Sequence, residues 1–148
     1  MNTHFAVAVH VLTFLAEQGG TPVTSEAVAS SVGTNASFIR RILARLGRAG
    51  LTTAQPGFAG GTILARPPDK ISLRDVYHAV DDERALIPLH PSPHPKCRVG
   101  RNIKGVLAGT VAKVEETVDA QLARTTIADL AADIGRRERE RGSTARNR

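Results

Sequence analysis

The sequence predicts a mainly α-helical protein with one small β-hairpin: a winged helix-turn-helix followed by a long C-terminal helix for dimerisation. Three observations lead to this fold class. Two short amphipathic segments, each with a capping residue, are joined by a Gly-Thr turn inside residues 24–50. A hairpin pattern with a glycine-rich tip follows them directly. Further on, a long segment repeats apolar residues at nearly coiled-coil spacing.

These features divide the 148 residues into four parts. We expect the winged helix-turn-helix over residues 1–80, a loop with Pro, His and Cys over residues 81–100, and the dimerisation helices over residues 101–135. A disordered basic tail is expected over residues 136–148. With no Trp and four Phe, the core must be mostly aliphatic.

Capping residues and the spacing of apolar residues predict a core of three helices. The first helix is expected over residues 2–18. Thr24 caps the second helix and Asn35 the third, because both side chains accept a hydrogen bond from a free amide of the first turn. Gly50 ends the third helix, as a residue that tolerates a positive φ does. The apolar positions of the first helix are Phe5, Val9, Leu12, Leu15 and Ala16. Those of the third helix are Phe38, Ile39, Ile42, Leu43 and Leu46.

A wing and a fourth helix follow the core. Residues 51–54 and 62–65 are expected to be the wing strands, with residues 56–61 as the tip between them. This glycine-rich tip lacks the Lys-Ser/Thr pair and the following helix of a nucleotide-binding loop, which excludes that use. Ser72 caps a short helix over residues 73–80.

Positive charge is concentrated in the helix-turn-helix and in the tail. The formal net charge is +6, of which residues 27–68 carry +5 and residues 136–148 carry +4, while residues 1–26 and 69–135 are net acidic. Residues 27–68 contain no Asp or Glu, so the cations there stand unopposed by any acid of that window. The pattern favours phosphates and base edges of double-stranded DNA over an ordinary solvated basic face.

The residues expected to bind DNA lie on the outer face of the third helix and on the wing tip. They are Asn35, Ser37, Arg40, Arg41, Arg45, Arg48, Phe58, Gly60 and Gly61. Arg40 and Arg41 are placed to reach guanine edges or phosphates, and the N-terminal end of the helix lies nearest the bases. Arg45 and Arg48 are expected to bind backbone phosphates, which sets register without reading sequence.

The long helix is expected over residues 102–124. Its narrow apolar stripe is Ile103, Leu107, Val111, Val114, Val118 and Leu122. Such a stripe needs a partner helix, and a second copy of the chain is the simplest one, because most soluble oligomers are symmetric dimers. A final short helix is expected over residues 126–134, closed by Gly135.

The proline-studded segment 87–98 is expected to be irregular, and it carries the chain's single cysteine. His90, His94 and Cys97 are metal-capable side chains, although three ligands without a second cysteine pair are a weak metal signal. Cys97 is better placed as a redox or thiol-reactive sensor, because nearby cations lower the pKa of a thiol. A purely structural role for Cys97 stays open.

Other classes of protein fit the sequence less well. A small thiol or metal enzyme centred on Cys97 would need a positioned base and an oxyanion site, which a proline-rich loop does not supply. A winged helix that binds protein is disfavoured by the arginine row without acids. No segment has the length and hydrophobicity of a membrane span, and one cysteine excludes an intramolecular disulfide, so a cytoplasmic location is expected.

Four segments in this order resemble the BadM/Rrf-type (Rrf-two) family of winged helix-turn-helix transcriptional regulators. They are AVAVHVL in the first helix, FIRRILARLGRAGL in the third, GFAGG in the wing and ISLRDVYHAV before the loop. The loop PHPKCRVGRNI is similar to the YwnA-like branch. The resemblance implies a homodimer with the long helix at its interface, two recognition helices on a palindromic operator, and wing tips near the minor groove. We expect such a regulator to act as a repressor that covers promoter sites.

The sequence departs from that family at two places. Iron–sulfur members carry three cysteines before the long helix, whereas this chain has only Cys97, so no cluster and no other cofactor are expected. Many members have an Arg before the wing glycine and an aromatic residue after the glycine pair. This chain has Pro56 and Thr62 there, which puts the family's wing contact in doubt.

Overall fold

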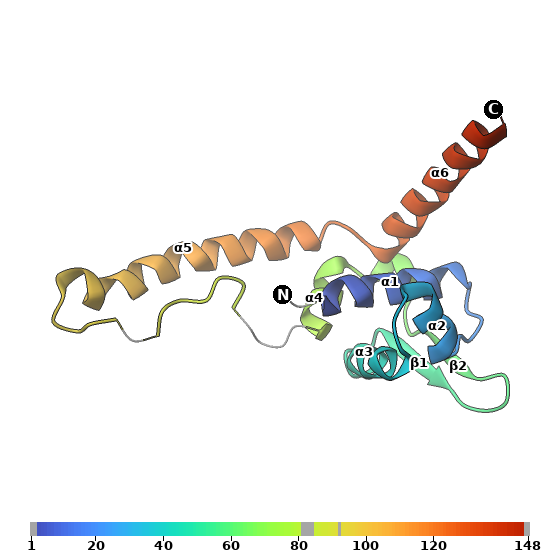
Figure 1. The fold of residues 1–148 in the computed structure, drawn as a ribbon, viewed down its shortest axis with the longest axis horizontal. Coiled ribbons are helices and arrows are strands. Elements are labelled where there is room, and N and C mark those ends of the chain that lie inside the picture. The colour runs from blue at the N-terminus through green and yellow to red at the C-terminus, as the bar shows by residue number, and fades with distance from the viewer. Residues whose placement is uncertain (1–2, 81–84, 92, 147–148) are drawn as a thin grey trace.

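The computed structural model describes residues 3–80, 85–91 and 93–146, and it shows a winged helix followed by two long helices (Figure 1). The elements are α1 (His4–Glu17), α2 (Ser25–Val32), α3 (Ala36–Arg48), β1 (Thr52–Gln55), β2 (Gly61–Leu64), the 3₁₀ turn η1 (Pro68–Lys70), α4 (Leu73–Val80), α5 (Arg98–Leu122) and α6 (Ile127–Arg146). The predicted fold class is confirmed. Parts of the predicted helix 2–18, loop 81–100 and tail 136–148 lie outside the described residues.

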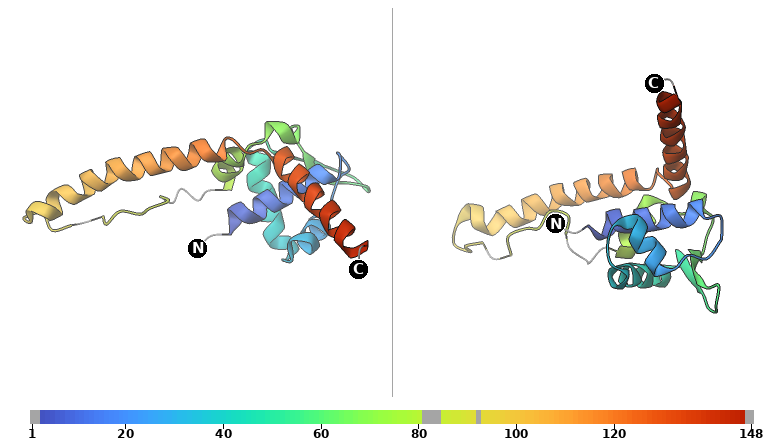
Figure 2. Two further views of the ribbon diagram at one scale, coloured as in Figure 1. Left: turned by 90° about the horizontal axis from the view of Figure 1, so that it is seen from above. Right: turned by 45° about the vertical axis from the view of Figure 1, so that its right-hand side comes forward.

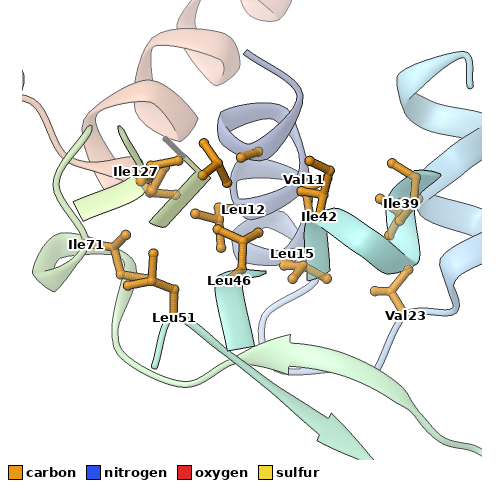
Figure 3. Packing of buried hydrophobic residues seen from close by; sticks show 14 of the residues in the cluster. Val11, Leu12, Leu15, Val23, Ile39, Ile42, Leu46, Leu51, Ile71 and Ile127 are labelled. Carbon is orange, nitrogen blue, oxygen red and sulfur yellow. The ribbon is translucent and has the colours of Figure 1, made fainter. Parts of the chain in front are cut away.

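The core is aliphatic and forms around α1, which contacts α2, α3, α4, α6 and β2 (Figure 3). Its largest fully buried side chains are Leu12, Ile39, Ile42, Leu46, Leu51, Ile71, Ile127, Val11, Val28, Val76 and Val80. Because helices cover α1 on several sides, its buried face is wider than the predicted stripe. Ala8 and Val11 are fully buried, whereas Phe5 and Val9 only pack against the edge of the core.

Both predicted caps of the helix-turn-helix are confirmed. Thr24 Oγ1 accepts a hydrogen bond from the Ala27 amide at 3.2 Å, and Asn35 Oδ1 accepts one from the Phe38 amide at 2.8 Å. The turn between α2 and α3 depends on Gly33, whose φ of 77° is in the left-handed region. These contacts fix where α3 begins and therefore which of its residues face outward.

The wing is a two-stranded antiparallel hairpin, with each strand shifted by one residue from its predicted range. Thr52 pairs with Leu64, and Gln55 pairs with Gly61 at the tip. The hairpin is also anchored to the connector before α2, because the Val23 and Thr62 amides each donate to the other residue's carbonyl, at 3.0 and 2.8 Å.

Two short capping motifs hold the start of α4 against the start of α6. Ser72 and Asp75 form one motif and Thr126 and Asp129 the other; in each, the carboxylate accepts bonds from the capping residue's amide and hydroxyl at 2.8–2.9 Å. The two capping residues lie opposite one another in an isolated bridge. The Ile127 amide donates to the carbonyl of Ile71 at 2.9 Å. This hydrogen bond ties the first residue of α6 to the core.

Helix α5 begins at Arg98, a turn earlier than the predicted residue 102, and it ends at Leu122. Asn102 is inside the helix, where its side-chain amide donates to the Arg98 carbonyl at 2.7 Å. One Gly within a helix costs only about 1 kcal/mol, so Gly100 does not delay the start. The helix extends away from the winged domain (Figure 1), and none of its residues is buried within the single chain.

The predicted end of the last helix at Gly135 and the predicted disorder of the tail from residue 136 are wrong as far as Arg146, because α6 is helical throughout. Arg and Glu are good helix formers, and charged pairs three residues apart support an exposed helix. Arg136 pairs with Asp133 at 2.7 Å, and Arg141 pairs with Glu138 at 3.3 Å. Local charge pairing therefore replaces the apolar contacts whose absence suggested disorder.

We predict that stability falls in acid through the two capping carboxylates. Burial raises the pKa of Asp75, but hydrogen bonds from Ser72 and the charges of Arg66 and Arg74 outweigh it, so this pKa is lowered. Hydrogen bonds from Thr126 likewise lower the pKa of Asp129. A lowered pKa stabilises the fold above the unfolded-state value of about 3.9, and this contribution is lost as the pH falls through the folded-state pKa.

Urea unfolding between pH 7 and pH 2 measures this effect. The variant Asp75→Asn/Asp129→Asn should be less stable at pH 7 and should lose less stability in acid than the unmodified chain. Asp69→Asn is the matched control, because Asp69 is exposed and forms no hydrogen bond within the described residues. Equal pH profiles for the double variant and the unmodified chain would contradict the role of the two carboxylates.

Candidate nucleic-acid interface

The candidate interface consists of the outer face of α3 and the wing. Both lie on one side of the winged domain, and α5 and α6 leave from the opposite side (Figure 1; Figure 2, right). The burial of Ile39, Ile42 and Leu46 turns the opposite face of α3 to solvent. The residues that helical periodicity places on that exposed face are Ser37, Arg40, Arg41 and Arg48.

Arg41 and Arg48 are exposed on this face, and neither forms an ion pair within the described part of the chain. The guanidinium carbon of Arg41 lies 5.6 Å from the centre of the Phe38 ring, an attractive cation–π contact. This contact supports Arg41 from one side and leaves its planar group facing solvent. Ser37 is exposed on the first turn of the same helix.

Arg40 is exposed but is paired with Glu26 of α2, contrary to the expectation that the arginines stand unopposed. Glu26 is one residue before the acid-free window, so a count along the sequence missed the pairing that the helix-turn-helix creates. The two side chains are 56% and 64% exposed. An exposed pair of this kind contributes at most about 1 kcal/mol, so a phosphate can displace the carboxylate from Arg40.

Arg45 does not stand outside the apolar stripe as predicted. Its side chain is half-buried, and one guanidinium nitrogen donates to the Val80 carbonyl at 3.1 Å and lies 3.4 Å from His4 Nδ1. The residue therefore joins α3 to the end of α4 and to α1. The sequence contained no signal for this contact, because the partners are 35 and 41 positions away.

Asn35 is exposed at the start of α3, where its side-chain oxygen is already occupied by capping. Its amide NH₂ group keeps two hydrogens for an outside acceptor. Capping uses one of the two lone pairs of the side-chain oxygen, so both amide hydrogens and one lone pair remain for the predicted base contact of Asn35.

The wing tip is apolar and carries no charge. Residues 49–65 include no Asp, Glu, Lys, Arg or His. Phe58 is 111% exposed, so its ring extends fully into solvent. Arg66, at the base of the wing, donates from Nε to the Gly50 carbonyl at 3.3 Å and so braces the turn after α3.

Cys97 is exposed and is the N-cap residue of α5. The backbone N–H groups of Gly100 and Val99 lower the pKa of its thiol, because the free amides of a first helical turn stabilise a thiolate. His90 and His94 do not join Cys97 in a metal site: no three His, Cys, Asp or Glu side chains within the described ranges are grouped to hold a metal ion.

The arm formed by α5 exposes more apolar surface than the predicted stripe. Val99 and Val106 are 66% and 69% exposed and widen the apolar face beside Ile103 and Leu107. Sequence spacing missed Val99 because it precedes the predicted start of the helix at residue 102, and it missed Val106 because that residue falls between two positions of the repeat. Across the described residues, no helix has the length and hydrophobicity to span a membrane.

Comparison with known proteins agrees with this arrangement. The profile of the Rrf2 family, described as an iron-dependent transcriptional regulator, matches residues 1–133. YwnA of Bacillus subtilis (strain 168), named as an HTH-type transcriptional regulator, is 35% identical over 130 residues, which cover 88% of this chain and 96% of YwnA.

Solved structures show the same fold. The crystal structure of a transcriptional regulator from Lactobacillus plantarum has a TM-score of 0.77 at 27% identity, covering 97% of this chain and 99% of that one. IscR of T. potens has a TM-score of 0.68 at 24% identity, with 90% and 87% covered, a likeness of fold alone. The resemblance predicted from the four sequence segments is confirmed, and the chain belongs to the Rrf2 family of transcriptional regulators.

Proposed function

We propose that the chain is a homodimeric, sequence-specific DNA-binding repressor that occupies a palindromic operator. The observation that carries this proposal is the outer face of α3, which is arginine-rich and exposed, beside a wing on the side of the domain opposite α5 and α6. An α-helix with its cations outward fits the major groove, and the adjoining hairpin then reaches the neighbouring groove.

The contacts divide by chemistry. Arg41 and Ser37 are on the exposed first turns of α3, where a recognition helix meets base edges. Arg48, at the far end, suits a backbone phosphate. Arg40 binds DNA by exchanging Glu26 for a phosphate or a guanine. Arg45 is assigned a structural role instead, because Val80 already accepts its hydrogen bond.

Dimerisation through α5 is supported by what this helix leaves uncovered. Its apolar face is exposed in the single chain, although the helix has 25 residues. A contiguous apolar face of this kind requires a partner surface. A second copy supplies one with matching spacing, and a two-fold dimer places two α3 helices on two symmetric half-sites, which predicts a palindromic operator. A dimer bound at a promoter represses by excluding the transcription machinery.

A response to thiol-reactive or oxidising signals through Cys97 is part of the proposal. The thiol is exposed, its pKa is lowered by the first turn of α5, and it stands at the start of the proposed dimer helix. Modification of Cys97 would alter the N-terminal turn of α5.

The family profile's description names iron, but the residues of this chain do not fit a cysteine-ligated iron–sulfur cluster. Such a cluster is held by several thiolates, and the chain has one cysteine. We therefore propose a regulator without that cofactor. The names of the matching relatives describe regulators, which agrees with a non-enzymatic role.

The first prediction concerns the arginines of α3. Binding to a duplex selected from random sequences should weaken steeply with salt, since neutralised phosphates release counterions. Arg41→Ala should lose about 1–3 kcal/mol of discrimination between bases. Arg48→Ala should weaken all sequences alike and reduce the salt slope by about two, one for each subunit of the dimer. Fluorescence anisotropy against salt concentration measures both quantities.

Two controls separate binding from folding. Arg45→Ala should lower the free energy of unfolding by about 1–2 kcal/mol, because it removes a charged donor from a half-buried carbonyl. Arg139→Ala, on the exposed part of α6, removes the same charge away from the interface and should leave DNA binding unchanged. Affinity that does not vary with salt, or an Arg41→Ala variant with full sequence preference, would refute the interface.

The second prediction tests the dimer. Leu107→Lys places a charge in the exposed apolar face of α5 and should shift the chain from dimer to monomer in analytical ultracentrifugation. Ala112→Lys introduces the same charged side chain at an exposed position on the other side of the helix, and this variant should stay dimeric. If the unmodified chain sediments as a monomer at micromolar concentration, α5 is not a dimer helix.

The third prediction tests Cys97. Alkylation or peroxide treatment should change the DNA affinity of the unmodified chain and should not change that of Cys97→Ser. The alkylation rate should remain high below the usual thiol pKa, because the thiolate persists to lower pH. A peroxide response that survives in Cys97→Ser removes this residue from signalling.

A further inference from the structure

The wing tip presents one aromatic ring that the protein does not use for its own packing. Phe58 is 111% exposed, whereas Phe5, Phe14 and Phe38 pack against the core. A fully exposed phenyl ring forgoes the free energy that its burial would release. Phe58 is in the turn between β1 and β2. This hairpin lies on the same side of the winged domain as α3 (Figure 1), so the ring is available for burial against a surface outside the chain.

The backbone under Phe58 is tightly built. The Gly60 amide donates to the Gly57 carbonyl at 3.0 Å, and Gly57 has a φ of 106°, which a residue with a side chain rarely adopts. A Cβ at Gly60 would lie 2.2 Å from the Gln55 carbonyl oxygen, and one at Gly61 would lie 2.5 Å from that of Val23. The glycines thus allow a close turn, and the turn projects the ring from an anchored base.

The chemistry of the tip excludes a charge-neutralising contact with phosphates. Residues 49–65 carry no ionisable side chain, so the wing cannot neutralise phosphates as a cationic wing does. Apolar wedges such as Phe enter the minor groove of DNA, partly unstack a base step and bend the duplex. Pyrimidine–purine steps yield most easily to this deformation.

We propose that Phe58 is a minor-groove wedge that inserts at a flexible pyrimidine–purine step beside each α3 contact, so that the wing reads the deformability of DNA. This inference rests on the proposed DNA-binding function. It makes Phe58 a specificity-determining residue that acts without charge, while the arginines of α3 supply the electrostatic affinity.

The test compares full-length Phe58→Ala and Phe58→Leu with the unmodified chain on the duplex selected by the latter. Phe58→Ala should bind at least roughly tenfold more weakly, because each subunit of the dimer loses a buried ring, with an unchanged salt slope. The duplex should bend less, as measured by energy transfer between dyes at its ends. Phe58→Leu keeps an apolar wedge and should retain most of the bend.

Two controls separate the loss of the ring's DNA contact from a loss of folding and from other changes on the wing. Thermal unfolding of Phe58→Ala should match that of the unmodified chain, because the exposed ring stabilises nothing in the free protein. Gln55→Ala changes an exposed wing residue without removing a ring and should keep both affinity and bend.

The outcomes separate this inference from the function on which it rests. Salt-dependent binding by the unmodified chain together with an unchanged affinity and bend in Phe58→Ala overturns the wedge and leaves the DNA-binding function standing. A lower salt slope in Phe58→Ala also overturns it, since the ring has no charge. Failure of the unmodified chain to bind any duplex overturns both.

Discussion

The packing of the aliphatic side of α3 against α1 is the constraint on which the rest of the structure depends. Ile39, Ile42 and Leu46 are almost completely buried there, and the geometry of an α-helix then determines which residues face solvent. The caps at Thr24 and Asn35 set where α2 and α3 begin. Capping and burial together therefore fix the rotation of α3 about its own axis. The exposed arginines are a consequence of that burial.

The second half of the chain obeys a different constraint. Its junction with the winged domain is held firmly, since paired capping motifs at Ser72 and Thr126 join α4 to α6 and Ile127 is buried in the core. Beyond this junction, α5 has an apolar face that the described part of the chain leaves unburied. A well-anchored arm with an uncovered face is the structure expected of a subunit whose folding is completed by association.

Local patterns predicted most of the fold, and long-range contacts account for what they missed. Helix α4 was predicted at its observed bounds, because its cap and spacing lie within ten residues. The burial of Arg45 depends on Val80, and the pairing of Arg40 depends on Glu26 across the turn; neither partner lies in the same helix. The tail is helical although it lacks apolar residues, because charged pairs three residues apart stabilise an exposed helix without a hydrophobic contact. Within the interface, sequence placed Arg41, Ser37 and Phe58 on exposed positions, but it did not distinguish them from Arg45.

The central claim is that two copies of α3 approach DNA on one face and in two-fold symmetry. Hydroxyl-radical footprinting of the full-length chain on its selected duplex tests this most directly. The account predicts two protected patches related by a dyad, with their centres about one helical turn of 10–10.5 base pairs, or a whole multiple of it, apart. A single asymmetric patch, or uniform reactivity along the duplex at saturating protein, would contradict it.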